Sequence, residues 1–206
     1  MEVGMKKGMK VFLIVLAVVL LLIFSLYRFW AGNYNAMVQK GETVDAAWAQ
    51  VQNQYQRRFD LIPNLVNTVK GYASHESEVF TNIADARSRA GGVLQVSDEV
   101  LNNPESFARF QQAQNELGSA LQRLLVITEN YPELKADQNF LALQDQLEGT
   151  ENRIGTERKR FNDVVRDYNT FIRQFPRVII ANMSGFTAKQ YFAAGTEAQS
   201  APQVQF

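Results

Sequence analysis

The residues with the most reactive side chains do not complete a catalytic motif. His75 is the single histidine of the chain and stands beside Glu76, a pair that opens the helical zinc-protease motif. That motif needs a second histidine one helical turn later, where this sequence has Val79. We therefore interpret His75 as a surface residue near a helix start.

Other catalytic patterns are also incomplete. The chain has no cysteine, which excludes disulfides, thiolate metal sites and thiol nucleophiles. Ser184 lacks the glycines two positions before and two positions after the serine that a nucleophile elbow requires. Glycine-rich phosphate loops are absent, and the carboxylates lack the Glu-x-x-His repeats of di-metal bundles. We expect no enzymatic activity, no cofactor and no bound metal.

The charge balance argues against nucleic acid as a partner. The 21 basic and 21 acidic side chains cancel, whereas nucleic-acid-binding domains carry a basic excess. The basic run of residues 158–160 stands beside Glu157 and Asp163, which is typical of a mixed-charge helix face. We expect neither a nucleic-acid partner nor a small-molecule substrate.

One segment has the composition of a membrane span. Residues 11–27 read VFLIVLAVVLLLIFSLY, and residues 28–30 extend this apolar surface. We assign residues 11–30 to a transmembrane anchor. A cleaved signal peptide is the alternative, but the apolar core is too long and no small-residue cleavage site follows it.

The basic residues around the span predict its orientation. Three lysines lie within residues 1–10, whereas the segment after the span is sparse in basic residues, with Arg28 and Lys40. The positive-inside rule predicts a cytoplasmic amino terminus and an extracytoplasmic domain of residues 31–192. Because no second apolar stretch is long enough to span, we expect a single-pass protein. Residues 193–206 are small and polar, which predicts a disordered tail.

Apolar residues at alternating steps of four and three predict a long helix after the anchor. The stripe is interrupted only by Arg58 and consists of Val44, Trp48, Val51, Tyr55, Ile62, Leu65, Val69 and Tyr72. Pro63 predicts a kink rather than a break. Gly71, followed by Ser74 as a cap, predicts a stop and a second helix, while the continuing pattern leaves one unbroken helix from Val44 to Ala90 as the alternative.

Glycine and proline residues predict where the second helix ends and where the third begins and ends. Gly91 and Gly92 are expected to end the second helix, and Asn103 with Pro104 opens a third, which Pro132 stops.

The last helix, from about Asp137 to Phe175, has the clearest period in the chain. An apolar or aromatic residue recurs every seven positions, at Phe140, Leu147, Ile154, Phe161, Tyr168 and Phe175. These patterns predict an all-α fold: an N-terminal transmembrane helix followed by an antiparallel up-down-up-down four-helix bundle with long, coiled-coil-like, heptad-patterned helices.

The interruption at Arg58 predicts a structural polar layer. Counting residues along antiparallel first and last helices puts Asp137 near the height of Tyr72, and Glu151 and Glu157 near that of Arg58. We predict a buried ion pair of Arg58 with Glu151 or Glu157 that fixes the register of the helices. An outward-facing, solvated Arg58 is the alternative.

An apolar segment follows the last helix and contains Val178, Ile179, Ile180, Phe186, Tyr191 and Phe192. A last helix that returns toward the membrane brings this segment to the membrane-proximal end of the bundle. Because burial of apolar side chains is favourable, we predict a membrane-proximal interaction segment that self-associates or docks to a partner, in preference to capping the bundle.

Two blocks of sequence resemble the LemA family of bacterial membrane-anchored proteins. Residues 34–76, YNAMVQKGETVDAAWAQVQNQYQRRFDLIPNLVNTVKGYASHE, resemble the family signature. Residues 147–176, LEGTENRIGTERKRFNDVVRDYNTFIRQFP, match its second block. The resemblance implies a bacterial source and a helical bundle behind one membrane helix, with no established enzymatic activity. With the predicted orientation, it places the anchor in the bacterial cytoplasmic (inner) membrane and the domain in the periplasm or outside the cell.

Two functional hypotheses follow. The first is a non-enzymatic scaffold or adaptor of the cell envelope, anchored in lipid, which forms a homo-oligomer or docks to other membrane proteins. The second is a binding module that senses a ligand or lipid and signals through its anchor. A polar-lined internal cavity would favour the second hypothesis.

Overall fold

The computed structural model describes residues 7–94 and 100–192, and every regular element within them is a helix. The helices are α1 (Lys7–Tyr72), α2 (Ser77–Leu94), α4 (Pro104–Thr128), α5 (Pro132–Lys135), α6 (Gln138–Arg173) and α7 (Arg177–Ser184). The all-α prediction is confirmed. The predicted tail of residues 193–206 lies outside the described residues.

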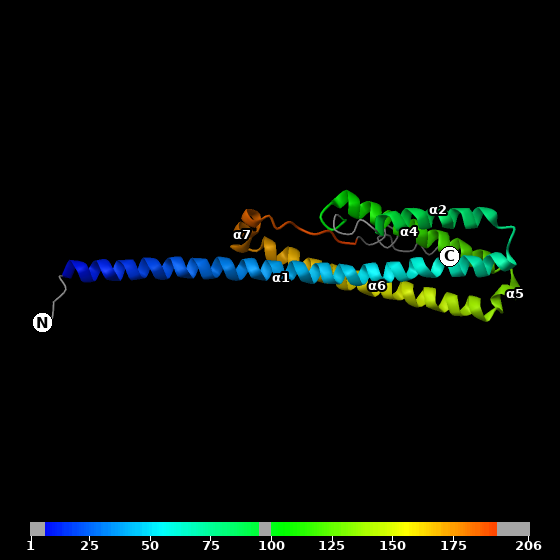
Figure 1. Cartoon of the computed structure of the whole chain (residues 1–206), viewed down its shortest axis with the longest axis horizontal. Coiled ribbons are helices and arrows are strands. Elements are labelled where there is room, and N and C mark those ends of the chain that lie inside the picture. Colours follow the sequence, from blue (N-terminus) through cyan, green and yellow to red (C-terminus); the bar gives the residue numbers. More distant parts are fainter. Residues whose placement is uncertain (1–6, 95–99, 193–206) are drawn as a thin grey trace, which may run out of the picture.

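Helix α1 unites the apolar segment and the first helix of the domain in 66 residues, a length of about 100 Å. Its N-terminal part is long and apolar enough to cross a membrane, and none of that part is buried in the chain (Figure 1). Burial begins at Met37, beyond which the predicted apolar stripe faces the domain. The helix passes through Pro63 without a break.

The stop predicted after Gly71 is confirmed, because α1 ends at Tyr72 and α2 begins at Ser77. The alternative of one unbroken helix is wrong. Ser74 lies in the turn three residues before α2 begins, and Glu76 is the residue that directly precedes the helix, so the predicted role of Ser74 as the cap is wrong as well.

The predicted end of the second helix at Gly91 is also wrong, since α2 continues to Leu94. A Cβ added to Gly91 would lie 3.1 Å from Cε2 of Phe59 in α1. The missing side chain thus allows α2 to approach α1 closely. The guanidinium of Arg87 lies 4.0 Å from the centre of the Phe59 ring and stabilises the same contact.

Two other predicted helix starts are confirmed, and at Asn103 the predicted cap is confirmed as well. The side chain of Asn103 accepts hydrogen bonds from the backbone N–H groups of Glu105 (2.9 Å) and Ser106 (3.3 Å). Asp137 caps α6 through the Phe140 N–H, at 2.8 Å. The third helix ends at Thr128, before Pro132, which instead opens the short α5.

The long helices pack as two neighbouring pairs, α1 with α6 and α2 with α4. Figure 1 shows that successive long helices run in alternating directions along the domain. One core cluster, around Trp48, Phe110 and Phe161, occupies the half nearer the apolar segment. A second, around Leu65, Leu117 and Phe140, occupies the far half.

Candidate functional site

Arg58 lies in the α1 stripe and is buried, with 4% of its side chain exposed. Its Nη1 donates a hydrogen bond to Oε1 of Glu151 on α6, at 3.0 Å. Its Nη2 donates to the backbone carbonyl of Gln114 on α4, at 3.2 Å, and to the side-chain oxygen of the same residue. The guanidinium therefore joins three helices at one level.

The two carboxylates considered as partners for Arg58 have different surroundings. Glu151 reaches Arg58 while 44% of its side chain stays exposed. Glu157 lies instead beside Arg160 on its own helix, with 4.0 Å between Oε2 and Nη1. The structure thus brings together Arg58 and Glu151, and Gln114, which the sequence did not suggest, completes the group.

A pocket of about 430 Å³ opens beside this group, between α4 and α6. Its lining is largely polar: Tyr55, Arg58, Gln114, Asn115, Gly118, Ser119, Gln122, Glu151, Ile154 and Arg158. Burial raises the pKa of Tyr55, and the cations of Arg158 and Arg58 act in the opposite direction. Nε of Arg58 and Nε2 of Gln114 are buried without a hydrogen-bond partner among the described residues.

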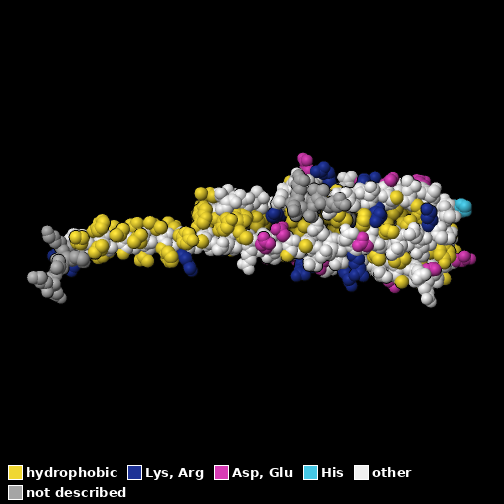
Figure 2. All heavy atoms as spheres, in the orientation of Figure 1, with side chains coloured by type: hydrophobic (Ala, Val, Ile, Leu, Met, Phe, Trp, Pro, Cys, Tyr) yellow, Lys and Arg dark blue, Asp and Glu magenta, His cyan; other side chains and the backbone are white. Residues whose placement is uncertain are grey.

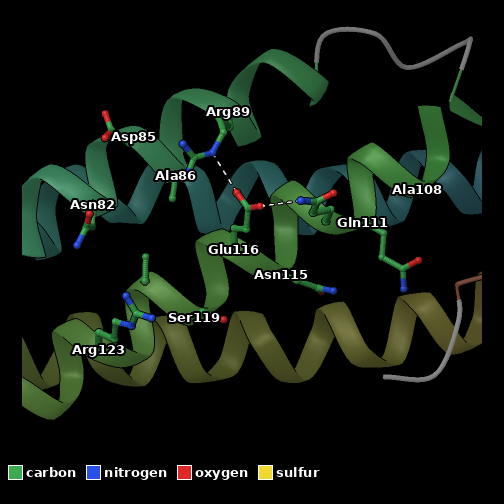
Figure 3. A pocket seen from close by; sticks show the side chains of 12 residues that line it. Asn82, Asp85, Ala86, Arg89, Ala108, Gln111, Asn115, Glu116, Ser119 and Arg123 are labelled. Atoms are coloured by element: carbon green, nitrogen blue, oxygen red, sulfur yellow. Dashed lines mark hydrogen bonds and ion pairs between the residues drawn. The ribbon is translucent and has the colours of Figure 1, made fainter. Parts of the chain in front are cut away.

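A second, larger groove of about 680 Å³ lies between α2 and α4 (Figure 3). Arg89 of α2 and Glu116 of α4 form an ion pair across it, with 3.0 Å between Nε and Oε2. Gln112 donates to the other oxygen of the Glu116 carboxylate, also at 3.0 Å. Arg89 is exposed and Glu116 is partly exposed, so this ion pair lies in a solvated polar groove.

The predicted interaction segment divides between the interior and the surface. Ile180 and Phe192 are buried, Val178 and Phe186 are half-buried, and Ile179 and Tyr191 are exposed. The prediction that the whole segment serves a partner therefore needs correction for its buried members. These side chains complete the core of their own chain.

Phe192 enters an aromatic cluster in that core. Its ring centre lies 5.0 Å from that of Phe107, 5.6 Å from that of Phe161 and 5.9 Å from that of Trp48. Arg158 covers the same ring at 4.5 Å. A well-packed phenylalanine of this kind is a major contribution to the core.

Two asparagines of α6 hold the extended segment that carries Phe192. Asn162 accepts from the backbone N–H of Phe192 at 2.9 Å and donates to its carbonyl at 3.0 Å. Asn169 makes the same pair of bonds with Lys189, each at 2.9 Å. The two asparagines stand seven residues apart on one face of α6, so both face this segment.

Helix α7 lies beside α1 just above the apolar span. Arg177 donates from Nε to Oδ1 of Asn33, at 3.0 Å, and the rings of Tyr34 and Phe186 meet edge to face at 5.5 Å. Gly185 ends α7 at φ 77°, a left-handed conformation that glycine adopts without strain. The segment is thus fixed at the membrane-proximal end of the domain.

Reactive groups are dispersed over the described residues. No three His, Asp or Glu side chains in residues 7–94 and 100–192 are placed to hold a metal ion. His75 is exposed in the turn between α1 and α2. The contacts described at Arg58 and at Arg89 are hydrogen bonds and ion pairs.

A helical domain continuous with an exposed apolar helix defines a membrane-associated helical protein. The model of the LemA family matches residues 47–206, so the chain belongs to the LemA family. This match confirms the resemblance seen in the two sequence blocks.

Several curated proteins are similar to the chain. Magnetosome protein MamQ of Magnetospirillum gryphiswaldense is 27% identical over 190 residues, which cover 84% of this chain and 70% of the relative. Magnetosome protein MamQ 2 of Paramagnetospirillum magneticum is 27% identical over 175 residues, covering 78% of this chain and 64% of the relative. Protein LemA of Metamycoplasma hominis is 22% identical over 149 residues, which cover 72% of this chain and 64% of the relative. The chain thus spans about two thirds of the length of these relatives.

Proposed function

We propose that this protein is a non-enzymatic, membrane-anchored helical scaffold or adaptor of the bacterial cell envelope. It acts by self-association or by docking to other membrane proteins. The observation that carries the proposal is the continuity of α1, which joins the apolar span and the folded domain without an intervening loop. An anchor of this kind holds the domain at a fixed height above the lipid.

Neighbouring copies would then present equivalent helix faces at the same level. Confinement to one membrane raises their effective concentration, so that modest contacts suffice for assembly. In this proposal the pairs α1/α6 and α2/α4 act as one up-down-up-down four-helix bundle. The bundle lies on the extracytoplasmic side and the amino terminus lies in the cytoplasm.

The relatives give limited support. Two of them are named magnetosome proteins, which is consistent with a membrane-associated role. Because the chain spans only about two thirds of their length, their own partners are not carried over. The membrane lipid contacted through the anchor is the first partner that we propose.

A second function is favoured by the polar pocket beside Arg58. Arg58, Arg158 and Gln114 converge on a space of about 430 Å³, which is the size range of small-ligand pockets. A ligand-sensing module that signals through α1 would use this pocket. Native mass spectrometry would test it: a small molecule should be retained on the purified wild type and lost from Ser119→Trp, which fills the pocket from its rim.

Crosslinking within the native membrane tests the scaffold. Because the chain has no cysteine, single cysteines can be placed at exposed sites on three helices, through Asn82→Cys, Arg123→Cys and Glu148→Cys. A bifunctional thiol reagent should give dimers or larger products from at least one variant, and the unmodified chain serves as control. Monomers alone at every position, with no foreign protein captured, would contradict the proposal.

A further inference from the structure

The outer face of α7 is apolar and uncovered. Phe175, just before the helix, is 82% exposed, and Ile179 and Met183 within it are 49% and 71% exposed. Ile179 and Met183 stand four residues apart and therefore lie on one face of α7, whereas Phe175 lies in the turn before the helix. Ile180 and Ala181 point into the core, so α7 is apolar on both its inner and its outer side.

The position of α7 along α1 sets the depth of this face. Arg177 is bonded to Asn33, which is three residues beyond Trp30, the last residue of the predicted span. Three residues correspond to about 4.5 Å along a helix. The polar layer of a bilayer adds about 5 to 7 Å on each side of its hydrocarbon core. Helix α7 therefore lies at the level of the lipid headgroups.

The two sequence segments nearest the apolar span carry basic side chains, and their first acidic neighbours in the sequence are Glu42 and Asp167. Residues 28–41 and 168–192 contain no Asp or Glu. Their charged residues are Arg28, Lys40, Arg173, Arg177 and Lys189. Such a surface attracts anionic headgroups.

Figure 2 shows apolar side chains gathered at the end of the domain next to the apolar part of α1. The exposed face of α7 is therefore continuous with the surface that meets lipid. A membrane-surface helix characteristically combines an apolar face with nearby basic side chains.

We propose that α7 is an interfacial helix whose exposed Ile179 and Met183, together with Phe175 in the turn before it, insert into the lipid surface of the membrane that α1 spans, with anionic headgroups around its basic neighbours. This contact fixes the tilt of the domain on the membrane. It goes beyond the scaffold function, since a single copy makes it without any protein partner.

Fluorescence quenching of the full chain in vesicles tests the proposal. Met183→Cys is labelled in detergent with an environment-sensitive fluorophore and reconstituted into vesicles of phosphatidylcholine and phosphatidylglycerol. Leu141→Cys is the matched control, because Leu141 is an apolar residue, 44% exposed, near the far end of the domain. Both substituted side chains are exposed, and circular dichroism verifies that the helices are retained.

The label at position 183 should lose fluorescence with lipid-borne bromine and resist iodide in the water, whereas the label at position 141 should show the opposite. Replacing phosphatidylcholine by more phosphatidylglycerol should strengthen the lipid quenching at position 183. Quenching of that label by iodide alone overturns the proposal. Protection from both quenchers also overturns it, because a second copy or another protein then covers the face.

Discussion

The guanidinium of Arg58 is almost completely buried, whereas the Glu151 carboxylate that it contacts at 3.0 Å is nearly half exposed. The two ends of this ion pair therefore have unequal access to water. A carboxylate left alone at this position can be hydrated, whereas the arginine cannot. The effect of a substitution at this pair on the unfolding free energy should therefore depend mainly on whether the buried charge of Arg58 keeps a partner.

Loss of Glu151 should consequently be costly. Glu151→Ala leaves a buried cation whose remaining partner is the neutral Gln114, and we expect a loss of about 1 to 3 kcal/mol of unfolding free energy. Glu148→Ala, at an exposed site one turn earlier on α6, should cost under about 0.5 kcal/mol. Chemical denaturation of the detergent-solubilised chain, followed by circular dichroism, measures both. Equal midpoints for the two variants would show that Glu151 does not stabilise buried Arg58.

Removal of the Phe192 side chain should destabilise the domain itself. Its ring is packed among Trp48, Phe107 and Phe161, so Phe192→Ala should cost about 2 to 4 kcal/mol. Tyr191→Ala, at the exposed neighbour, should cost less than about 1 kcal/mol. Thermal melting by circular dichroism compares the two. If Phe192→Ala instead barely changes the melting temperature but gives a smaller assembled complex, Phe192 serves in assembly, as the sequence analysis predicted for this segment.

The long-range features of the fold were predictable where they follow from helical periodicity. The stripe from Val44 to Val69 is buried throughout, including Arg58. The residue count that placed Asp137 near Tyr72 is confirmed by a hydrogen bond of 3.0 Å between their side chains. Periodicity and antiparallel direction together fix the relative height of residues that are far apart in the sequence.

Features that depend on one particular tertiary contact were not predictable in this way. Gly91 is a helix breaker by propensity, but here it gives Phe59 the space to pack against α2. Burial of Phe192 depends on Asn162 pairing with an extended backbone thirty residues later. Neither contact leaves a mark in the local composition, so the apolar segment could equally be read as a surface for partners.

The start of α6 should weaken in acid. The Phe140 N–H and then the Tyr72 hydroxyl donate to the Asp137 carboxylate and lower its pKa below the ordinary value of 3.8. A lowered folded-state pKa gives stability that is present above the unfolded-state value and is lost as the pH falls through the folded-state value. Asp137→Asn should therefore flatten the decline of the melting temperature below about pH 4.

The pH series has two comparison variants. Tyr72→Phe removes the second of these hydrogen bonds and should give part of the effect. Asp145→Asn, at an exposed site on the same helix, should leave the acid profile as it is in the unmodified chain. An unchanged profile in Asp137→Asn would contradict the role of this cap.

The proposed orientation of the chain in the membrane is a prediction from its charges. Lys7 and Lys10 flank the amino-terminal end of the apolar span, and moving them across the bilayer is disfavoured, so the helical domain should be exported. Thr156→Cys, on an exposed position of α6, should react with a membrane-impermeant maleimide in intact cells, or after permeabilisation of an outer membrane where one exists. Gly8→Cys, at the other end of the span, should react only after the membrane is dissolved. Both variants must label in detergent, which controls for reactivity, and protection of position 156 with labelling of position 8 would reverse the proposed topology.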